Sequence, residues 1–475
     1  MKKLMLFLMC ILLLTGCGTA QLPASEPATE PTIQPPQVID YFDYEYLHEN
    51  PRDLAWEEDI VFFAKTMLGT DTVDGQPYLT TNTVEIMSSD VGTSEASEYR
   101  SLYNEYMHQE FLESVSALIG QIPNLTDMQI QYELRRIVCA LEDCHSQMLV
   151  QREASFPLAV ELLECDGELG LYAVRLPVSF GHLIYAKLIA INDIPIEEVF
   201  QKMAPYLNGE SSWGALAMFA NITKGNYLAR LEALQAAGIV SIDTKNARFR
   251  FLSDNGEEEI ILEAVPAEVG YTEDLINLHH VNAESLSWSQ YLYEDYFFRY
   301  FPDDDTLYIR LYSVPGNHSG KLSGFIANIK KVVQEQNGVR KTILDLRDNG
   351  GGTPDTLQEL TDFLKEPITG MKYILINEAC FSASVSIPYS IRTASETAAI
   401  IGSPAAQGPN SPYHNNQLYT MKNHGLEFYF SMGFVELNPN YEYDTLIPDI
   451  YIYQNLDDYI NGVDTVLETV WNLPA

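Results

Sequence analysis

The sequence feature that most constrains the fold is the alternation of two patterns in residues 303–475. Short, strongly apolar runs rich in β-branched residues alternate there with stretches in which apolar residues recur at helical spacing. The runs span 306–312, 342–346, 372–376 and 398–401, and helical patterns occupy 322–334 and 355–364. Strands that alternate with helices form a sheet with helices packed against it. We therefore predict a layered α/β domain over 303–475.

Residues 41–150 have a helical pattern throughout. The clearest helix begins at Thr126, because Gln129 three residues later completes a capping box. The apolar residues of 130–141 then fall on one face. His145 lies four residues beyond Leu141 and extends that face at the predicted C-terminal end, where the helix dipole favours an imidazolium. The alternative for His145 is a polar residue that only ends a helix.

Residues 151–302 combine strand and helix patterns. The runs 171–176 and 258–264 predict strands, and Asn192-Asp193 marks a turn before a helix. The order of strand, turn and helix resembles a PDZ-type domain, which implies binding of an extended peptide end at a sheet edge. Residues 209–238 would then be a helical insertion that a minimal PDZ domain lacks, and a generic α+β domain is the alternative. The whole chain is thus predicted to be an α/β (α+β) multi-domain protein.

The first 40 residues predict the location of the protein. Lys2 and Lys3 precede an apolar run over 4–14 that is too short to span a bilayer and is typical of a signal peptide, here 1–16. The ending Leu-Thr-Gly-Cys17 resembles a bacterial lipobox, which implies cleavage before Cys17 and lipid attachment to its sulfur. Residues 17–40 predict a Pro-rich, lipid-anchored linker. We expect an extracytoplasmic protein anchored to the bacterial cell membrane; an ordinary secretory signal is the alternative.

The charge of the chain excludes some partners. There are 66 acidic and 28 basic residues, a net charge of −38. Such an excess repels phosphate backbones, so we expect no nucleic acid as a partner. Without Lys2 and Lys3 the net charge becomes −40. If the functional cleft shares this acid excess, basic or neutral peptides would bind better than acidic ones.

The cysteines and histidines give no metal-site pattern. Four cysteines remain beyond Cys17, namely Cys139, Cys144, Cys165 and Cys380. An oxidising location permits a disulfide among them, but the sequence does not select a pairing. No CxxC or HExxH motif occurs, so we expect neither a structural zinc nor another metal or cofactor.

Two segments of the α/β domain carry the chemistry. In 342–352 an apolar strand runs into Asp-Leu-Arg-Asp-Asn and three glycines, which allow left-handed backbone angles and bring N–H groups close to a bound group. In 374–384 a strand ends, and small residues around Ser382 open a helix. A serine at such a turn lies next to outward-pointing N–H groups, which suits a tetrahedral oxyanion.

Together these segments resemble the C-terminal processing (tail-specific) proteases, a family of serine peptidases, and in particular its tricorn-core and interphotoreceptor-retinoid-binding-protein-like branch. The stretch LDLRDNGGG matches the family signature Asp-Leu-Arg-x-Asn-x-Gly-Gly, and LINEACFSAS falls where the family carries its nucleophile. The resemblance implies a ClpP/crotonase-like catalytic domain with Ser382 as nucleophile. It also implies oxyanion donors at Ala383, Gly351 and Gly350, and a closing strand within 444–452.

The resemblance also suggests the base. One branch uses a lysine in a Gly-Lys-Gly turn, but 402–408 contains no lysine here. The tricorn-like branch uses a histidine in a motif that Asp143-Cys144-His145 resembles, which implies a Ser–His mechanism. Glu442 matches a glutamate of that branch and would orient the imidazole; Asp143 is the local alternative.

The predicted function is that of a lipid-anchored serine endopeptidase that cleaves peptides or unfolded proteins through an acyl-enzyme. Departures from the family pattern at Cys144 and over 402–408 bear on substrate preference and activity. One alternative is therefore an inactive relative that binds peptides or another ligand at the cell surface. A separate alternative uses Cys380, two residues before Ser382, as the nucleophile. The sequence does not indicate the oligomeric state.

Overall fold

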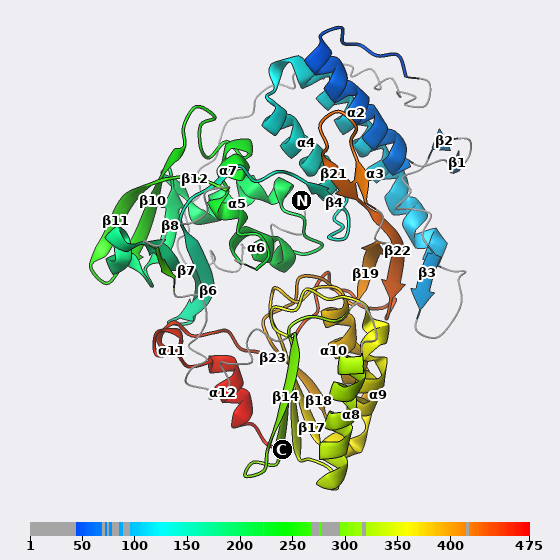
Figure 1. The fold of residues 1–475 in the computed structure, drawn as a ribbon, viewed down its shortest axis with the longest axis vertical. Coiled ribbons are helices and arrows are strands. Elements are labelled where there is room, and N and C mark those ends of the chain that lie inside the picture. Colours follow the sequence, from blue (N-terminus) through cyan, green and yellow to red (C-terminus); the bar gives the residue numbers. More distant parts are fainter. Residues whose placement is uncertain are drawn as a thin grey trace, which may run out of the picture.

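The computed structural model describes residues 44–475 apart from 69–71, 74–75, 78–84, 89–95, 222, 268–274, 278–294, 316–319 and 415–417. The predicted signal peptide, Cys17 and the predicted linker therefore lie outside the described residues. Figure 1 shows three lobes, which we call the helical lobe, the middle lobe and the α/β lobe; the C-terminus lies in the last of them.

The α/β lobe is built on a six-stranded sheet. Its strands are, in spatial order, β14 (Tyr296–Phe301), β15 (Thr306–Leu311), β16 (Lys341–Asp345), β17 (Met371–Ile376), β18 (Ala398–Gly402) and β23 (Ile450–Tyr451). The β14–β15 pair is antiparallel, and the other pairs are parallel. The four strands predicted in this region and the α/β class are thus confirmed.

Helices cover both faces of this sheet. Successive side chains of a strand point to opposite faces, so apolar residues are buried on each. Helices α8 (Gly320–Glu335), α9 (Gln358–Lys365) and α10 (Ala383–Ala394) lie along one side of the sheet, and α12 (Thr465–Trp471) lies on the other (Figure 1). On β15, Leu307 and Ile309 join the core with α8–α10, whereas Tyr308 joins the core with α12. Burial on both faces explains why these strands have continuous apolar sequences.

The middle lobe contains a seven-stranded antiparallel sheet. It consists of β6 (Ala159–Cys165), β7 (Glu168–Pro177), β8 (Lys187–Ile191), β9 (Ile194–Pro195), β10 (Asn246–Ser253), β11 (Gly256–Glu263) and β13 (Leu275–Asn277). Three helices accompany it: α5 (Ile196–Met203), α6 (Ser212–Ala220) and α7 (Leu231–Ala236). The strands predicted over 171–176 and 258–264 are confirmed, and 209–238 contains α6 and α7. The PDZ-type resemblance stays a prediction.

The helical lobe is completed by a hairpin from the far end of the chain. Its helices are α2 (Pro51–Leu68), α3 (Ala96–Gln121) and α4 (Asp127–Cys139). The capping box of Thr126 and Gln129 begins α4, as predicted. Strand β4 (Gln147–Leu149) pairs with β21 (Glu427–Tyr429), and β21 pairs with β20 (Tyr419–Thr420). Phe428 and Phe430 thereby join the core of the helical lobe.

The remaining elements are short or link the lobes. They are β1 (Thr72–Val73), β2 (Gln76–Pro77), β3 (Glu85–Ser88), β5 (Ala154–Ser155), β12 (Val265–Pro266), β19 (Asn410–His414), β22 (Ser431–Glu436) and α11 (Leu456–Ile460). On α11, Tyr459 packs against β6 of the middle lobe. Segments after residue 303 therefore return to both other lobes. Within the described residues, no helix has the length and apolar character needed to cross a bilayer.

Candidate active site

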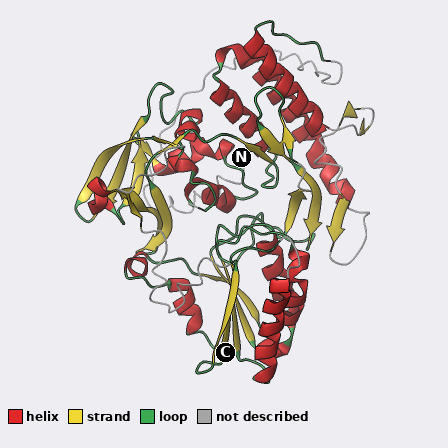
Figure 2. Cartoon of the chain, viewed as in Figure 1, coloured by secondary structure: helices red, strands yellow, loops and turns green. Residues whose placement is uncertain are grey.

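The loops after the parallel strands form a layer that faces the other two lobes (Figure 2). Ser382 lies in this layer, at the turn between β17 and α10, and is half-buried. Its backbone has φ 60° and ψ −123°, a conformation that a serine rarely adopts. Strain of this kind is often stored at active sites, where the surrounding structure holds one residue in a fixed position. The turn therefore presents Ser382 as the sequence predicts.

Asn349 joins the glycine turn to the serine turn. Its side chain is fully buried and donates a hydrogen bond of 2.9 Å to the carbonyl oxygen of Leu311. The carbonyl oxygen of Asn349 accepts hydrogen bonds from the N–H of Phe381 (3.1 Å) and from Oγ of Ser384 (2.7 Å). The residues on both sides of Ser382 are thus anchored to the turn after β16.

Two glycines of this turn are required by close contacts. A Cβ on Gly351 (φ 90°) would lie 2.5 Å from the carbonyl oxygen of Phe381, and one on Gly352 (φ 141°) would collide with the carbonyl group of Val314. Gly351 thus lies directly against the serine turn, as its predicted oxyanion role requires. Its N–H donates to Oδ1 of Asn349 at 2.7 Å.

Ala383 is the first residue of α10, so its N–H has no partner within the helix. The predicted donors Ala383 and Gly351 are therefore adjacent in space, and Gly350 continues the same turn. By contrast, the N–H of Ser382 itself donates to Oε1 of Gln407 at 3.1 Å. Gln407 belongs to the 402–408 stretch, where one branch of the resembled family has its lysine.

The Asp-Leu-Arg part of the motif has a structural role. Asp345 is fully buried between Arg310 (2.6 Å) and Arg347 (2.7 Å) and accepts a hydrogen bond from Tyr308. Arg347 also contacts Asp464 at 2.7 Å, just before α12. Burial alone would raise the pKa of Asp345, but the two guanidinium groups hold this pKa well below its usual range. These charges fix the end of β16.

His145 lies beside the serine turn. The prediction that it lies at the C-terminal end of a helix is wrong. Helix α4 ends at Cys139, and His145 occupies a turn six residues later. This turn is stabilised by Asp143, which accepts hydrogen bonds from the N–H of His145 (2.8 Å) and from Oγ of Ser146 (2.6 Å). The ring of His145, 6% exposed as a residue, packs on the ring of Phe381 with centroids 4.3 Å apart.

Glu210 is the carboxylate that the sequence analysis missed. Its Oε1 lies 3.7 Å from Nδ1 of His145, and both side chains are buried. Burial raises the pKa of Glu210 to about 7, against the opposing attraction of His145. Glu442 is exposed in the stretch between β22 and β23, whereas Glu210 lies beside the imidazole; the predicted role of Glu442 stays a prediction. No local pattern links Glu210 to His145, because their contact depends on the packing of two lobes.

Asp143, His145 and Glu210 could also hold a metal ion, since their ligand atoms all lie within 4.8 Å of one another. This geometry was not expected from the sequence. Both oxygens of Asp143 already accept hydrogen bonds within the turn, and Oε1 of Glu210 accepts one from the N–H of Cys144 at 3.3 Å. The cluster therefore suits a histidine and its carboxylate partner as well as a cation.

Cys380 is a poor nucleophile in this setting. Its thiol is fully buried, donates to the carbonyl oxygen of Leu346 at 3.0 Å, and has its pKa raised to about 12 by burial. Burial also raises the pKa of Cys144 well above its usual value. All four described cysteines are free, so no disulfide joins them.

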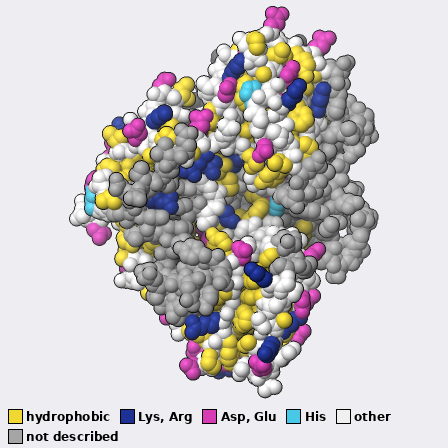
Figure 3. Space-filling model, viewed as in Figure 1, with side chains coloured by type: hydrophobic (Ala, Val, Ile, Leu, Met, Phe, Trp, Pro, Cys, Tyr) yellow, Lys and Arg dark blue, Asp and Glu magenta, His cyan; other side chains and the backbone are white. Residues whose placement is uncertain are grey.

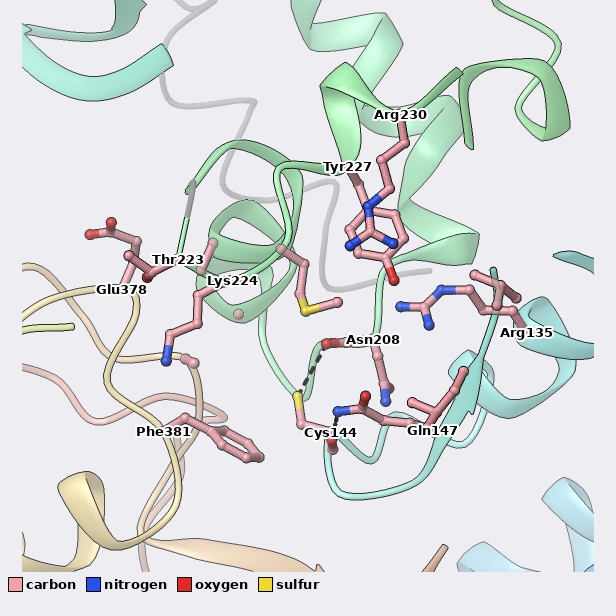
Figure 4. A pocket seen from close by; sticks show the side chains of 16 residues that line it. Arg135, Cys144, Gln147, Asn208, Thr223, Lys224, Tyr227, Arg230, Glu378 and Phe381 are labelled. Carbon is pink, nitrogen blue, oxygen red and sulfur yellow. Dashed lines mark hydrogen bonds between the residues drawn. The ribbon is translucent and has the colours of Figure 1, made fainter. Parts of the chain in front are cut away.

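A cavity of about 400 Å³ opens beside the site (Figure 4). Phe381 and Cys144, the neighbours of Ser382 and His145, form part of its wall, and Lys224, Arg135 and Arg230 also line it. Lys224 reaches the glycine turn, since a Cβ on Gly350 would lie 3.1 Å from its Nζ. Burial lowers the pKa of Lys224. This cavity therefore does not share the acid excess of the whole chain.

The comparisons with known proteins show the fold. No protein-family model matches the sequence, and no curated protein does. Mature CPAF complexed with lactacystin is similar in structure, with a TM-score of 0.55 at 11% identity, over 88% of this chain and 98% of that one. A CPAF mutant (TM-score 0.55, 11% identity, 89% and 97% coverage) and mature CPAF (0.51, 11%, 89% and 97%) are similar too. The chain therefore shares its three-lobed fold with mature CPAF.

Proposed function

We propose that the protein is a serine peptidase in which Ser382 is the nucleophile and His145 the base. The observation that carries this proposal is the packing of the His145 ring on Phe381, the residue next to Ser382. It brings a buried imidazole from the helical lobe to a strained serine that is fixed at the start of α10. The fold shared with mature CPAF and the family signature over 345–352 agree with this assignment.

The chemistry follows from the roles of these groups. His145 takes the proton of the Ser382 hydroxyl, and Oγ then bonds to the carbonyl carbon of a peptide. The N–H of Ala383 stabilises the oxyanion, joined by that of Gly351 once it leaves Oδ1 of Asn349, and the imidazolium returns its proton to the leaving amine. Water next hydrolyses the acyl-enzyme by the same proton transfers. Glu210 orients the imidazole and stabilises its cation when ionised.

A fluorophosphonate probe tests this proposal, because it phosphonylates only an activated serine. We expect labelling of the full-length protein, none of Ser382→Ala, and a loss of about 100-fold or more in labelling rate for His145→Gln. Ser386→Ala is the matched control, since Ser386 lies one turn further along α10 and is also half-buried. Equal labelling of the protein and Ser382→Ala would overturn the assignment.

The second candidate is an inactive relative that binds peptides in the same place. It is favoured by the hydrogen bonds that already use the N–H groups of Ser382 and Gly351, since a peptidase needs free donors for the oxyanion. This candidate predicts no probe labelling of the folded protein, together with saturable peptide binding that Ser382→Ala retains.

We also propose that the protein is secreted and held at the membrane by a lipid on Cys17. The support is the predicted signal peptide and the lipobox-like ending before Cys17. A clickable palmitate analogue fed to expressing bacteria should label the protein, and Cys17→Ser should remove both the label and the protein from the membrane fraction. Labelling that survives Cys17→Ser would refute the anchor.

A further inference from the structure

The cavity beside Ser382 collects positive charge in a strongly acidic protein. The net charge of the chain is −38, yet three cations, Arg135, Arg230 and Lys224, line this one cavity. In Figure 3, Lys and Arg side chains lie around the hollow where the lobes meet. The positive charge of this cavity, opposite in sign to the charge of the whole chain, is not explained by the overall composition.

Arg135 is the least expected of the three. It is only 2% exposed and comes from α4. Its Nε donates to the carbonyl oxygen of Tyr206 (2.7 Å) and its Nη1 to that of Met148 (3.0 Å), which ties α4 to the short helix that ends at Tyr206 and to β4. Nη2, however, has no hydrogen-bond partner among the described residues. Figure 4 shows the guanidinium directed into the cavity, toward Tyr227.

Tyr227 holds the two arginines near each other. The guanidinium carbon of Arg135 lies 4.6 Å from the ring centre of Tyr227, and that of Arg230 lies 3.9 Å from it. Arg230 also donates to the carbonyl oxygen of Gly225 at 3.0 Å. Among the described residues, none of the ion pairs formed involves either arginine. Two guanidinium groups therefore share one aromatic platform without a carboxylate.

Glu378, the acidic residue on the cavity wall, does not neutralise the two arginines. Both oxygens of Glu378 accept hydrogen bonds, one from Nδ2 of Asn221 (3.3 Å) and one from Oγ of Ser403 (3.0 Å). Burial also raises the pKa of Glu378. A buried guanidinium without an anion is costly, because its lost hydration is not replaced. An anionic ligand that reaches Nη2 of Arg135 would remove this cost.

We propose that this cavity is a subsite that binds a carboxylate of the peptide, so that the protein selects substrates with a negative charge near the cleaved bond. This proposal rests on the proposed peptidase function, because a subsite for substrates requires that the protein cleaves peptides. A planar carboxylate matches the fork of a guanidinium, and Phe381 places the cavity next to Ser382. The carboxylate comes from an Asp or Glu side chain or from a peptide C-terminus.

Binding to the full-length Ser382→Ala protein tests the subsite without turnover. The probes are fluorescent mixed-sequence decapeptide pools in two pairs: internal Glu against internal Gln with amidated ends, and a free against an amidated C-terminus without internal acids. We expect the carboxylate-bearing pool of at least one pair to bind about 10-fold more tightly at low salt. The pair that shows the difference identifies the source of the carboxylate.

Second substitutions identify the residues. Arg230→Gln should reduce the difference to about 2-fold or less, and Arg230→Lys should keep part of it. Arg248→Gln is the matched control, an exposed arginine of the middle lobe that pairs with Asp193. Arg135→Gln provides a second variant, with thermal unfolding to confirm that α4 still packs. Equal binding within both pairs, or a difference that survives both Gln variants, would overturn the subsite.

The two proposals fail separately. A protein that the fluorophosphonate does not label, but whose Ser382→Ala form binds carboxylate peptides selectively, overturns the peptidase and leaves the subsite. A labelled protein with no charge selectivity overturns the subsite and leaves the peptidase.

Discussion

Ser382 and His145 lie side by side but are held in position by different kinds of contact. The serine turn stands on consecutive strands of one sheet and is tied to the preceding turn by hydrogen bonds to Asn349. The buried charges beneath it are matched, since Asp345 lies between Arg310 and Arg347. Asn349, Asp345, Arg310 and Arg347 all belong to the α/β lobe.

The histidine side is assembled from separate segments and its charges are less well matched. His145 lies in a turn of the helical lobe, Glu210 comes from the loop before α6, and Phe381 belongs to the α/β lobe. Burial raises the pKa of Glu210 to about 7, so its charge varies near neutral pH. We infer that the contacts around Ser382 contribute mainly to stability, whereas those around His145 determine the protonation of the imidazole and of Glu210. Substitutions should therefore separate stability from activity.

The largest expected effect is on the serine side. Asp345→Ala leaves two buried guanidinium groups without their carboxylate and should lower the free energy of unfolding by about 3–5 kcal/mol. Urea unfolding followed by circular dichroism measures this loss. Asp362→Ala is the control, because Asp362 pairs with Lys365 on the surface and should cost less than about 1 kcal/mol. Similar losses for both variants would remove the contrast.

Glu210→Gln should show the opposite combination. We expect kcat/KM for peptide cleavage to fall by about 100-fold or more, because the imidazolium loses its partner. The free energy of unfolding of the Gln variant should exceed that of the unchanged protein by an amount that grows as the pH rises. The raised pKa means that ionisation of Glu210 costs nothing below about pH 4.5, costs more as the pH rises to about 7, and stays constant above.

At pH 8 the Gln variant should therefore be more stable by up to about 3 kcal/mol, at about 1.4 kcal/mol per pKa unit, and at pH 4 it should equal the unchanged protein. Thermal unfolding at the two pH values checks this. A variant that loses stability at pH 8 would place Glu210 with the matched charges of the serine side.

A smaller effect is expected from relief of strain at Ser382. With φ 60°, this position favours glycine, so Ser382→Gly should be more stable than Ser382→Ala by about 1 kcal/mol. Both variants lack the hydroxyl, which removes activity as a variable. Equal melting temperatures would show that the turn is not strained.

The smallest effect should come from chelation. If Glu210 and His145 act as a proton-transfer pair, excess EDTA should leave peptide cleavage and probe labelling unchanged. Loss of activity that added zinc restores would instead assign Asp143, His145 and Glu210 to a metal site.

The sequence predicted the serine side better than the histidine side for a physical reason. The strands, the glycine turn and the serine turn lie within single stretches, so local patterns report on them. At His145 the pattern predicted a longer helix, but α4 ends at Cys139. Glu142 then adopts φ 51° and Asp143 accepts a hydrogen bond from the N–H of His145, so the chain forms a turn instead. The assignment of Ser382 as nucleophile stays a prediction.

Contacts between distant segments could not be predicted from one sequence. Glu210 meets His145 only after two lobes pack, and the cations of the cavity come from two lobes. The net charge of the chain did not indicate the cations of this cavity, because it sums over the whole protein and does not report on one cavity. The strand predicted within 444–452 did appear as β23, since it completes a local sheet edge.

The hairpin of β20 and β21 has a consequence for the order in which the protein matures. The turn that carries His145 is held from the far end of the chain, where β21 pairs with β4 and the N–H of Ser431 donates to Oγ of Ser146 at 2.9 Å. Ribosomes and export channels deliver the N-terminal end first. We therefore expect a chain that has emerged only as far as residue 418 to contain both His145 and Ser382 and still lack a seated imidazole, so that the nascent protein is inert toward its neighbours until almost all of it is present.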